Sequence, residues 1–319
     1  MIPSTAHFVW YGPRLQYLHA LAIRSAATHG GFERVRLHHA DPLDALPHVS
    51  ALRELPNVEF VPLDDQALCE AVSGPALATL CGALKSPVAR ANIARVALLC
   101  RDGGVYLDMD TLTIRSFDAL RAQAPAWIGR ERIVFPGFVV RSRDPRVKAK
   151  AYAMTAIRDG FRRWPHGYRA FRRIEGRYHL AVNNAVLGGV AGHGLWRAAL
   201  ETMAELPKAR WQQSYALGTH LFQRVCESYD GGDFELLPPP LFFPLPPEIS
   251  AHWFRRYKRG VDVAAAIDPS TLTVHWYASV RTKRVVATMN GEPALRRLEH
   301  HQLYSSLACR VLDGAPIPA

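Results

Sequence analysis

The N-terminal part of the chain alternates short apolar runs with stretches in which apolar residues recur at helical spacing. Residues 6–10, 32–38 and 58–61 have the length and the β-branched or aromatic content of strands. Leucine and alanine residues between 15 and 22 recur every three or four positions, as on one face of a helix. This rhythm predicts an α/β fold built from βαβ units, of the kind found in nucleotide-binding sheets.

Residues 86–116 predict a helix, a tight turn and a short strand in direct succession. The serine-proline pair at 86–87 starts the helix, because serine can cap it and proline is tolerated at its first position. Two glycines at 103–104 end the helix, and residues 105–107 form a short apolar strand. This strand runs straight into Asp-Met-Asp at 108–110, so two carboxylates follow a buried element.

The rest of the chain continues the alternation, interrupted by one proline-dense segment. Further strands are predicted at 127–134, 138–141, 181–188 and 273–279. Further helices are predicted at 145–157, at 196–206 and from about 295 onward. Residues 238–247 predict an extended surface loop, since their prolines alternate with apolar residues that need burial. No repeat, heptad seam, G-x-G-x-x-G, Walker or G-x-S-x-G motif is present in the sequence.

Composition predicts a large core and a reducing compartment. Hydrophobic residues are 49% of the 319 residues, enough for a substantial core. The sequence contains no run of about 18 apolar residues, the length that a transmembrane helix needs. The N-terminus lacks the basic and apolar regions of a secretory signal. Five scattered cysteines without a C-x-x-C pair predict buried free thiols. We therefore expect a cytoplasmic protein.

The chain is strongly basic, with a formal net charge of +11. Such a balance attracts phosphorylated glycolipid, nucleic acid or an acidic membrane surface, although a GC-rich coding sequence also enriches arginine. Arginines interleave with aromatic residues at 161–179 and again at 252–259. These segments predict peripheral contact with the inner face of a membrane or with a phosphorylated acceptor, and the alternative is an amphipathic helix pair with a solvated arginine face. We expect no nucleic-acid partner, because only charge supports one.

Asp108 and Asp110 are the strongest candidates for chemistry. Two carboxylates separated by one residue at a strand end point to the same side, and burying both is costly without a cation or hydrogen-bond donors. Carboxylate oxygens suit Mg²⁺ or Mn²⁺. The alternative is that the pair merely solubilises the strand end. An EF-hand does not fit, because Asp102 is followed by two glycines rather than by alternating oxygen ligands.

This stretch resembles the sugar-binding region containing the DXD motif of glycosyltransferases of the family 32 type, which are distantly similar to the clostridial glucosylating toxins. Eight positions match the family pattern: Arg95, Leu99, Gly103, Gly104, Tyr106, Leu107, Asp108 and Asp110. Two positions depart from it, since Ala91 stands where serine is usual and Asn92 where aspartate is usual. In the family that aspartate helps hold the donor sugar or ribose, so the resemblance implies that Asn92 lies in the donor site. Asn92 keeps a hydrogen-bonding oxygen but loses the charge, which is expected to change sugar preference and turnover.

The resemblance implies a GT-A-like, Rossmann-type mixed sheet flanked by helices, with a helical and loop acceptor subdomain. It implies one catalytic domain over 1–319, with a nucleotide-sugar-binding half at 1–120, an acceptor-side half at 121–290 and a C-terminal helix and tail at 291–319. It further implies a retaining transferase that uses Mn²⁺ (or Mg²⁺) and a UDP-sugar. The expected acceptor is a glycan or glycolipid of bacterial cell-surface polysaccharide or lipopolysaccharide. The alternatives are an effector-like protein glycosyltransferase and a non-catalytic protein that binds nucleotide sugar or polyanions.

The resemblance also implies roles for particular residues near the motif. Asp110 is the expected direct metal ligand, and Asp108 is expected to contact donor hydroxyls or the metal. His275, in a segment similar to the family's closing H-x-W-x-x-S-W, is the expected third ligand, because a neutral imidazole can bind Mn²⁺. The alternative for His275 is a core histidine bonded to backbone. Arg95 is expected to offset charge on the departing phosphate, and Tyr106 to lie in the donor site.

Other residues are carried over from weaker matches. Trp10 ends a strand similar to the family's first strand, so its ring is expected to stack on uracil, and the alternative is a core tryptophan. Asn183 and Asn184 lie in a strand that lines the acceptor side in the family, and at least one amide is expected to face a cleft. The alternative for this pair is a structural turn. Ser279 is expected at the diphosphate, with Arg281 and Lys283.

Overall fold

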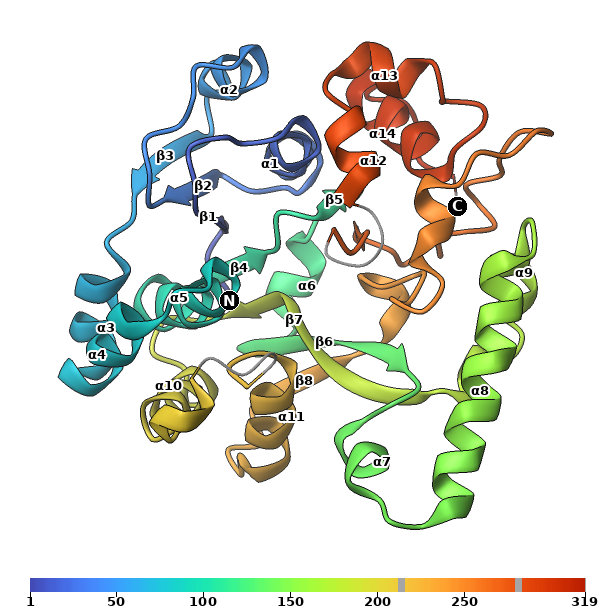
Figure 1. Cartoon of the computed structure of the whole chain (residues 1–319). Coiled ribbons are helices and arrows are strands. Elements are labelled where there is room, and N and C mark those ends of the chain that lie inside the picture. Colours follow the sequence, from blue (N-terminus) through green and yellow to red (C-terminus); the bar gives the residue numbers. More distant parts are fainter. Residues whose placement is uncertain (212–215, 279–282, 319) are drawn as a thin grey trace.

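The computed structural model describes residues 1–211, 216–278 and 283–318, and its centre is a seven-stranded sheet of order β3-β2-β1-β4-β7-β6-β8 (Figure 1). The strands of this sheet are β1 (Thr5–Trp10), β2 (Arg34–His39), β3 (Val58–Pro62), β4 (Gly104–Leu107), β6 (Ala126–Ile133), β7 (His179–Gly189) and β8 (Phe234–Leu237). The first four are parallel to one another, whereas β7 is antiparallel to both β4 and β6. The predicted mixed α/β sheet is therefore confirmed.

Fourteen α-helices and several short 3₁₀ turns accompany the strands in the part of the chain that the structure describes. The N-terminal helices are α1 (Tyr17–His29), α2 (Pro47–Arg53), α3 (Asp65–Ser73), α4 (Pro75–Ala83), α5 (Pro87–Asp102) and α6 (Asp118–Gln123). The central helices are α7 (Gly137–Arg141), α8 (Pro145–Arg163), α9 (Gly167–Phe171), α10 (Gly194–Ala204) and α11 (Thr219–Ser228). The C-terminal helices are α12 (Lys283–Thr288), α13 (Glu292–Arg296) and α14 (Leu303–Asp313).

Helices cover both faces of the sheet, and the alternation of side chains along the strands decides which core each residue joins. In β1, Val9 faces the core formed with α3, α4, α5, α10 and α11, whereas Phe8 faces the core formed with α1 and α2. In β4, Tyr106 belongs to the first core and Leu107 to the second. Strands buried on both faces explain the continuous apolar runs in the sequence.

A third core lies beneath the C-terminal part of the chain. It joins α8 and α9 to α14 and to a second, two-stranded sheet made of β5 (Thr111–Thr113) and β9 (Thr273–His275). These two strands are antiparallel, with Thr111 opposite His275. The pairing carries a segment from near the C-terminus back to the residues that follow β4.

The sequence misjudged some elements. The strand predicted at 138–141 is wrong, because these residues form α7 behind Pro136, with Phe138 and Val140 exposed and Val139 buried. Over so few residues, the apolar pattern of a strand cannot be distinguished from that of a single helical turn. Helix α8 extends six residues beyond the predicted end, and α3, α4, β5 and β8 were not predicted at all.

Two observations bear on the compositional expectations. All five cysteines are unpaired, and three of them are buried. Within the described ranges, no helix has both the length and the apolar character that crossing a membrane requires.

A buried pair of histidines ties β1 and β2 to the turn before β4. His7 Nδ1 lies 3.0 Å from His38 Nε2, and His7 Nε2 lies 2.9 Å from the carbonyl oxygen of Gly103. Burial lowers the pKa of His7 to about 4 and that of His38 to about 3, because burial disfavours the charged form of each ring.

We expect the free energy of unfolding to fall as the pH drops from about 6.5 to about 4. In this window the unfolded chain binds protons that the folded histidines cannot, which removes on the order of 3 kcal/mol for each histidine. Urea unfolding at pH 7.5 and pH 5 measures the loss, and His38→Gln should make it smaller. An equal loss in wild type and variant would contradict this assignment.

Candidate active site

The turn that delivers the two aspartates depends on glycine. Ser86 caps α5 by accepting a hydrogen bond from the amide of Ala89, and the helix ends where Gly103 and Gly104 take positive φ values of 67° and 107°. A β-carbon on Gly104 would lie 2.5 Å from the carbonyl oxygen of Thr5 in the neighbouring strand. Only glycine therefore lets α5 pass directly into β4 at this close approach.

Asp108 is held in one orientation by two neighbours from the same stretch. Its Oδ1 accepts a 2.7 Å hydrogen bond from the Tyr106 hydroxyl and lies 3.1 Å from Arg95 Nη2. The Arg95 guanidinium also packs over the Tyr106 ring, 4.5 Å from its centroid. Helical spacing in α5 and alternation in β4 thus bring three residues of the motif together.

Arg95 does not reach into open space. Its side chain is only 5% exposed, and its other N–H groups bond to the carbonyl oxygens of Ala91 and Asn184. Because these donors are used within the protein, Arg95 holds Asp108 from the buried side of the site. Its expected role in offsetting charge on a departing phosphate stays a prediction.

Asp110 and His275 face each other because β9 pairs with β5. The backbone amide of Trp276 donates to the Asp110 carbonyl oxygen at 2.9 Å, and His275 Nε2 lies 2.9 Å from Asp110 Oδ1. The amide of Ala278 donates to Asp110 Oδ2 at 2.6 Å. The motif is therefore completed by a segment about 165 residues further along the chain.

The charges of this cluster depend on one another. Burial alone would raise the pKa of Asp110, but the His275 charge, its hydrogen bond and the Ala278 amide lower it to about 2. Burial likewise favours neutral His275, yet the neighbouring Asp110 raises its pKa. Burial and the Asp110 charge raise the pKa of Asp108, against the effect of Arg95.

One ligand atom each from Asp108, Asp110 and His275 lies within 4.8 Å of the other two. Two carboxylates and one imidazole are a donor set that Mn²⁺ or Mg²⁺ accepts, with Mn²⁺ the better match to the nitrogen. Among the described residues, buried His275 Nδ1 has no hydrogen-bond partner, so the polar contact of this ring is with Asp110, while Phe243 and Tyr277 pack against it. The three residues expected to bind metal are thus brought together, and their chemistry fits a divalent cation.

An aromatic layer lies beside this cluster, and it contains Trp10. The His19 ring lies between Trp10, at 5.0 Å, and Trp276, at 5.5 Å, and His19 Nδ1 lies 2.8 Å from the Met109 carbonyl oxygen. Trp10 is only partly buried at the carboxyl end of β1. Its position is compatible with base stacking, while the ring also packs against the core.

An irregularity in β7 positions the two asparagines. Ile128 pairs with Leu187 and Arg130 with Val182, so residues 183–186 lie opposite the single residue Gly129. The extra residues turn Asn183 and Asn184 out of the regular ladder, next to the end of β4.

Both amides are nearly covered and have protein partners. Asn184 Nδ2 donates to Asn92 Oδ1 at 2.8 Å, and Asn183 Oδ1 accepts from the Ala185 amide. Asn183 is 6% and Asn184 7% exposed, so protein atoms cover most of each amide, and the expected cleft-facing role of the pair stays a prediction. Asn92, the departure from the family pattern, therefore joins α5 to β7 through its oxygen.

Sequence reasoning missed a buried acid next to this site. Glu131 is 7% exposed and accepts a 2.8 Å hydrogen bond from the Tyr277 hydroxyl, and Asn183 also bonds to it. Burial raises the pKa of Glu131, against the effect of these two donors. The available signal was a single acid between two arginines in an otherwise apolar strand. Ser279 and Arg281 lie outside the described residues, and Lys283 begins α12.

Solved structures of several glycosyltransferases overlap this fold in part. They include the PaToxG glycosyltransferase (13% identity, TM-score 0.45, covering 72% of this chain and 71% of that one). Mouse xyloside xylosyltransferase 1 has 14% identity and a TM-score of 0.43, covering 86% of this chain and 98% of that one. The galactosyltransferase LgtC has 15% identity and a TM-score of 0.43, covering 90% and 95%. These overlaps say nothing of substrate.

The sequence itself gives a more specific comparison. No curated protein matches the chain significantly. Residues 29–127 match the family model described as the glycosyltransferase sugar-binding region containing the DXD motif. This range includes α5, the glycine turn, β4 and both aspartates of the cluster. Residues 29–127 of this chain are therefore similar to the glycosyltransferase sugar-binding region containing the DXD motif, the region that the sequence was expected to resemble.

Proposed function

We propose that this protein is a metal-dependent, retaining glycosyltransferase that moves a sugar from a UDP-sugar to a glycan or glycolipid. The observation that carries the proposal is the convergence of Asp108, Asp110 and His275 at the carboxyl edge of the sheet, beside Trp10. Nucleotides bind at this edge in open α/β sheets. The matched glycosyltransferase region supports the same reading.

The chain's residues would hold the donor in a defined geometry. Asp110 and His275 would bind the cation directly and Asp108, fixed by Arg95 and Tyr106, would complete its protein ligands. A divalent cation bound there supplies positive charge to the diphosphate. Trp10 would stack on the uracil, and the Asn92–Asn184 pair would line the sugar.

In the proposed transfer the bond between the sugar C1 and the UDP β-phosphate oxygen breaks, and a bond from the acceptor oxygen to C1 forms on the same face. The proton of the acceptor hydroxyl passes to the departing phosphate oxygen, so no carboxylate nucleophile is needed. The basic surface of the chain suits a phosphorylated glycolipid acceptor.

A thermal-shift series with UDP, GDP, CDP and ADP, each with and without Mn²⁺, tests the donor site. A ligand at about 100 times its Kd stabilises the native state by about 2.7 kcal/mol, which raises the midpoint by several degrees. We expect a shift for UDP that requires Mn²⁺, disappears in Asp110→Ala and persists in Asp230→Ala, which removes an exposed aspartate. No shift with any nucleotide, or one indifferent to Mn²⁺ and to Asp110→Ala, would overturn the proposal.

Glu131→Gln separates same-face attack from double displacement. The glutamine retains an oxygen for the Tyr277 hydroxyl, so the fold should persist, as melting will check. We expect Mn²⁺-dependent hydrolysis of the UDP-sugar to stay within about tenfold of wild type. The reason is that Glu131 accepts hydrogen bonds from the Tyr277 hydroxyl and from Asn183, and same-face attack gives it no direct part in the reaction. Double displacement requires a carboxylate nucleophile at the anomeric carbon. A loss of about a thousandfold in a folded variant would identify Glu131 as that nucleophile.

A further inference from the structure

The exposed apolar side chains of the described chain are concentrated in one region. Eight large apolar side chains are exposed, and six of them lie between residues 138 and 180. The same region, 137–180, contains twelve basic and three acidic residues, a net charge of +9 out of +11 for the whole chain. Apolar exposure and positive charge therefore coincide in a region away from the Asp108 cluster.

Helix α8 is the main element of this region, and Figure 1 shows it running along one edge of the molecule. Only Ala151 and Arg158 of its 19 residues are buried, and Val147, Met154 and Phe161 pack partly against the core. At about 1.5 Å per residue the helix is about 28 Å long. A helix of this length with so narrow a buried stripe presents most of its surface to the surroundings.

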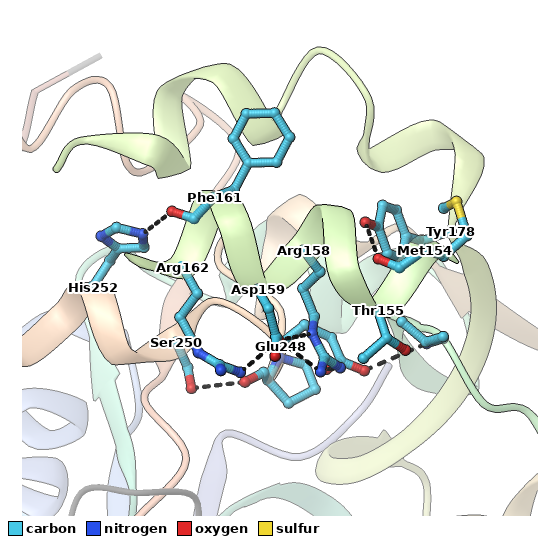
Figure 2. Close-up of polar contacts among 12 residues, drawn as sticks. Met154, Thr155, Arg158, Asp159, Phe161, Arg162, Tyr178, Glu248, Ser250 and His252 are labelled. Atoms are coloured by element: carbon cyan, nitrogen blue, oxygen red, sulfur yellow. Dashed lines mark hydrogen bonds and ion pairs between the residues drawn. The ribbon is translucent and has the colours of Figure 1, made fainter. Parts of the chain in front are cut away.

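The buried side of α8 is fixed by polar contacts (Figure 2). Arg158 pairs with Glu248 and, at 2.8 Å, with Asp159, while Arg162 pairs with Asp159 at 2.9 Å. The Tyr178 hydroxyl donates to the Met154 carbonyl oxygen at 3.0 Å. The only acid of α8 therefore faces its own arginines on the packed side.

The last turn of α8 is tied down as well. His252 Nε2 lies 3.0 Å from the Phe161 carbonyl oxygen (Figure 2), and Arg255 donates to the carbonyl oxygens of Arg162 and Arg163. These bonds satisfy carbonyls that a helix end would otherwise leave without partners. Because both side and end are fixed, the opposite face of α8 is held outward.

The outward face of α8 combines apolar and cationic side chains without a carboxylate. Tyr152 is 65% exposed, Ile157 45% and Trp164, at the end of the helix, 57%. Small exposed residues fill the positions between them: Ala149, Ala153, Ala156 and Gly160. Exposed cations flank this band at Arg146, Lys150 and Arg163, and their side chains form no hydrogen bond or ion pair within the described residues.

We infer that this face of α8 docks on an anionic lipid membrane, with its apolar band in the interfacial region and its cations against the headgroups. Amphipathic helices with aromatic and aliphatic residues on one face and flanking Lys or Arg bind membranes in this way. A nucleic-acid site would place cations along the middle of the face, where α8 has alanine and glycine. Docking goes beyond the proposed transferase reaction and does not depend on it.

Flotation with vesicles of 70% phosphatidylcholine and 30% phosphatidylglycerol tests the docking. We expect binding at low salt that is absent with pure phosphatidylcholine and falls as salt screens the charges. The triple variant Arg146→Gln, Lys150→Gln, Arg163→Gln should bind at least ~10-fold more weakly. Tyr152→Ser with Ile157→Ser should also weaken binding, because the apolar contact is lost.

Matched controls distinguish vesicle binding by this face of α8 from an effect of net charge alone and from any contribution of the transferase site. Removing three exposed cations elsewhere, through Arg34→Gln, Lys85→Gln and Arg197→Gln, should leave binding within about twofold. Asp110→Ala should bind vesicles like wild type, so failure of the donor site does not affect this result. Equal weakening by the two triple variants, or tighter binding to a single-stranded oligonucleotide than to vesicles, would overturn the docking surface.

Discussion

Two carboxylates lie at the end of a buried strand, and the surrounding structure compensates for their charge. Asp108 has Arg95 and Tyr106, and Asp110 has His275 and a backbone amide. An uncompensated carboxylate at such depth would cost several kcal/mol. These partners come from α5, from β4 and from the segment at and just after β9, so all three must be in place before the pair can be ionised.

This requirement relates the site to the fold. The glycine turn and the His7 pair set the entry into β4, and the pairing of β5 with β9 returns the C-terminal segment to Asp110. The irregular pairing of β7 places the Asn184 carbonyl on Arg95 and its amide on Asn92. A partly buried tryptophan and a buried glutamate border the cluster. A divalent cation would replace the His275 interaction of Asp110 and would require that ring to be neutral.

Local patterns in the sequence predicted the elements that carry the motif. Ser86, the helical repeat of α5, the two glycines and the short strand β4 were all found, because each depends on neighbours within a few residues. The structure also brings His275 to the aspartates, as the resemblance implied. The partners of Asn183 and Asn184, the role of Glu131 and the inward position of Arg95 depend on contacts between distant segments, which periodicity does not encode. Helix α7 was mistaken for a strand for a local reason, since five residues do not distinguish a strand from a single helical turn.

Electron spin echo envelope modulation of Mn²⁺ bound to the protein tests the cation site of Asp108, Asp110 and His275 most directly. This measurement detects a nitrogen ligand through its coupling to the metal and needs neither donor nor acceptor. We expect nitrogen modulation from one imidazole in wild type, its loss in His275→Gln, and much weaker Mn²⁺ binding in Asp110→Asn. Mn²⁺ bound without nitrogen coupling, or with coupling that survives His275→Gln, would contradict a site formed by Asp108, Asp110 and His275.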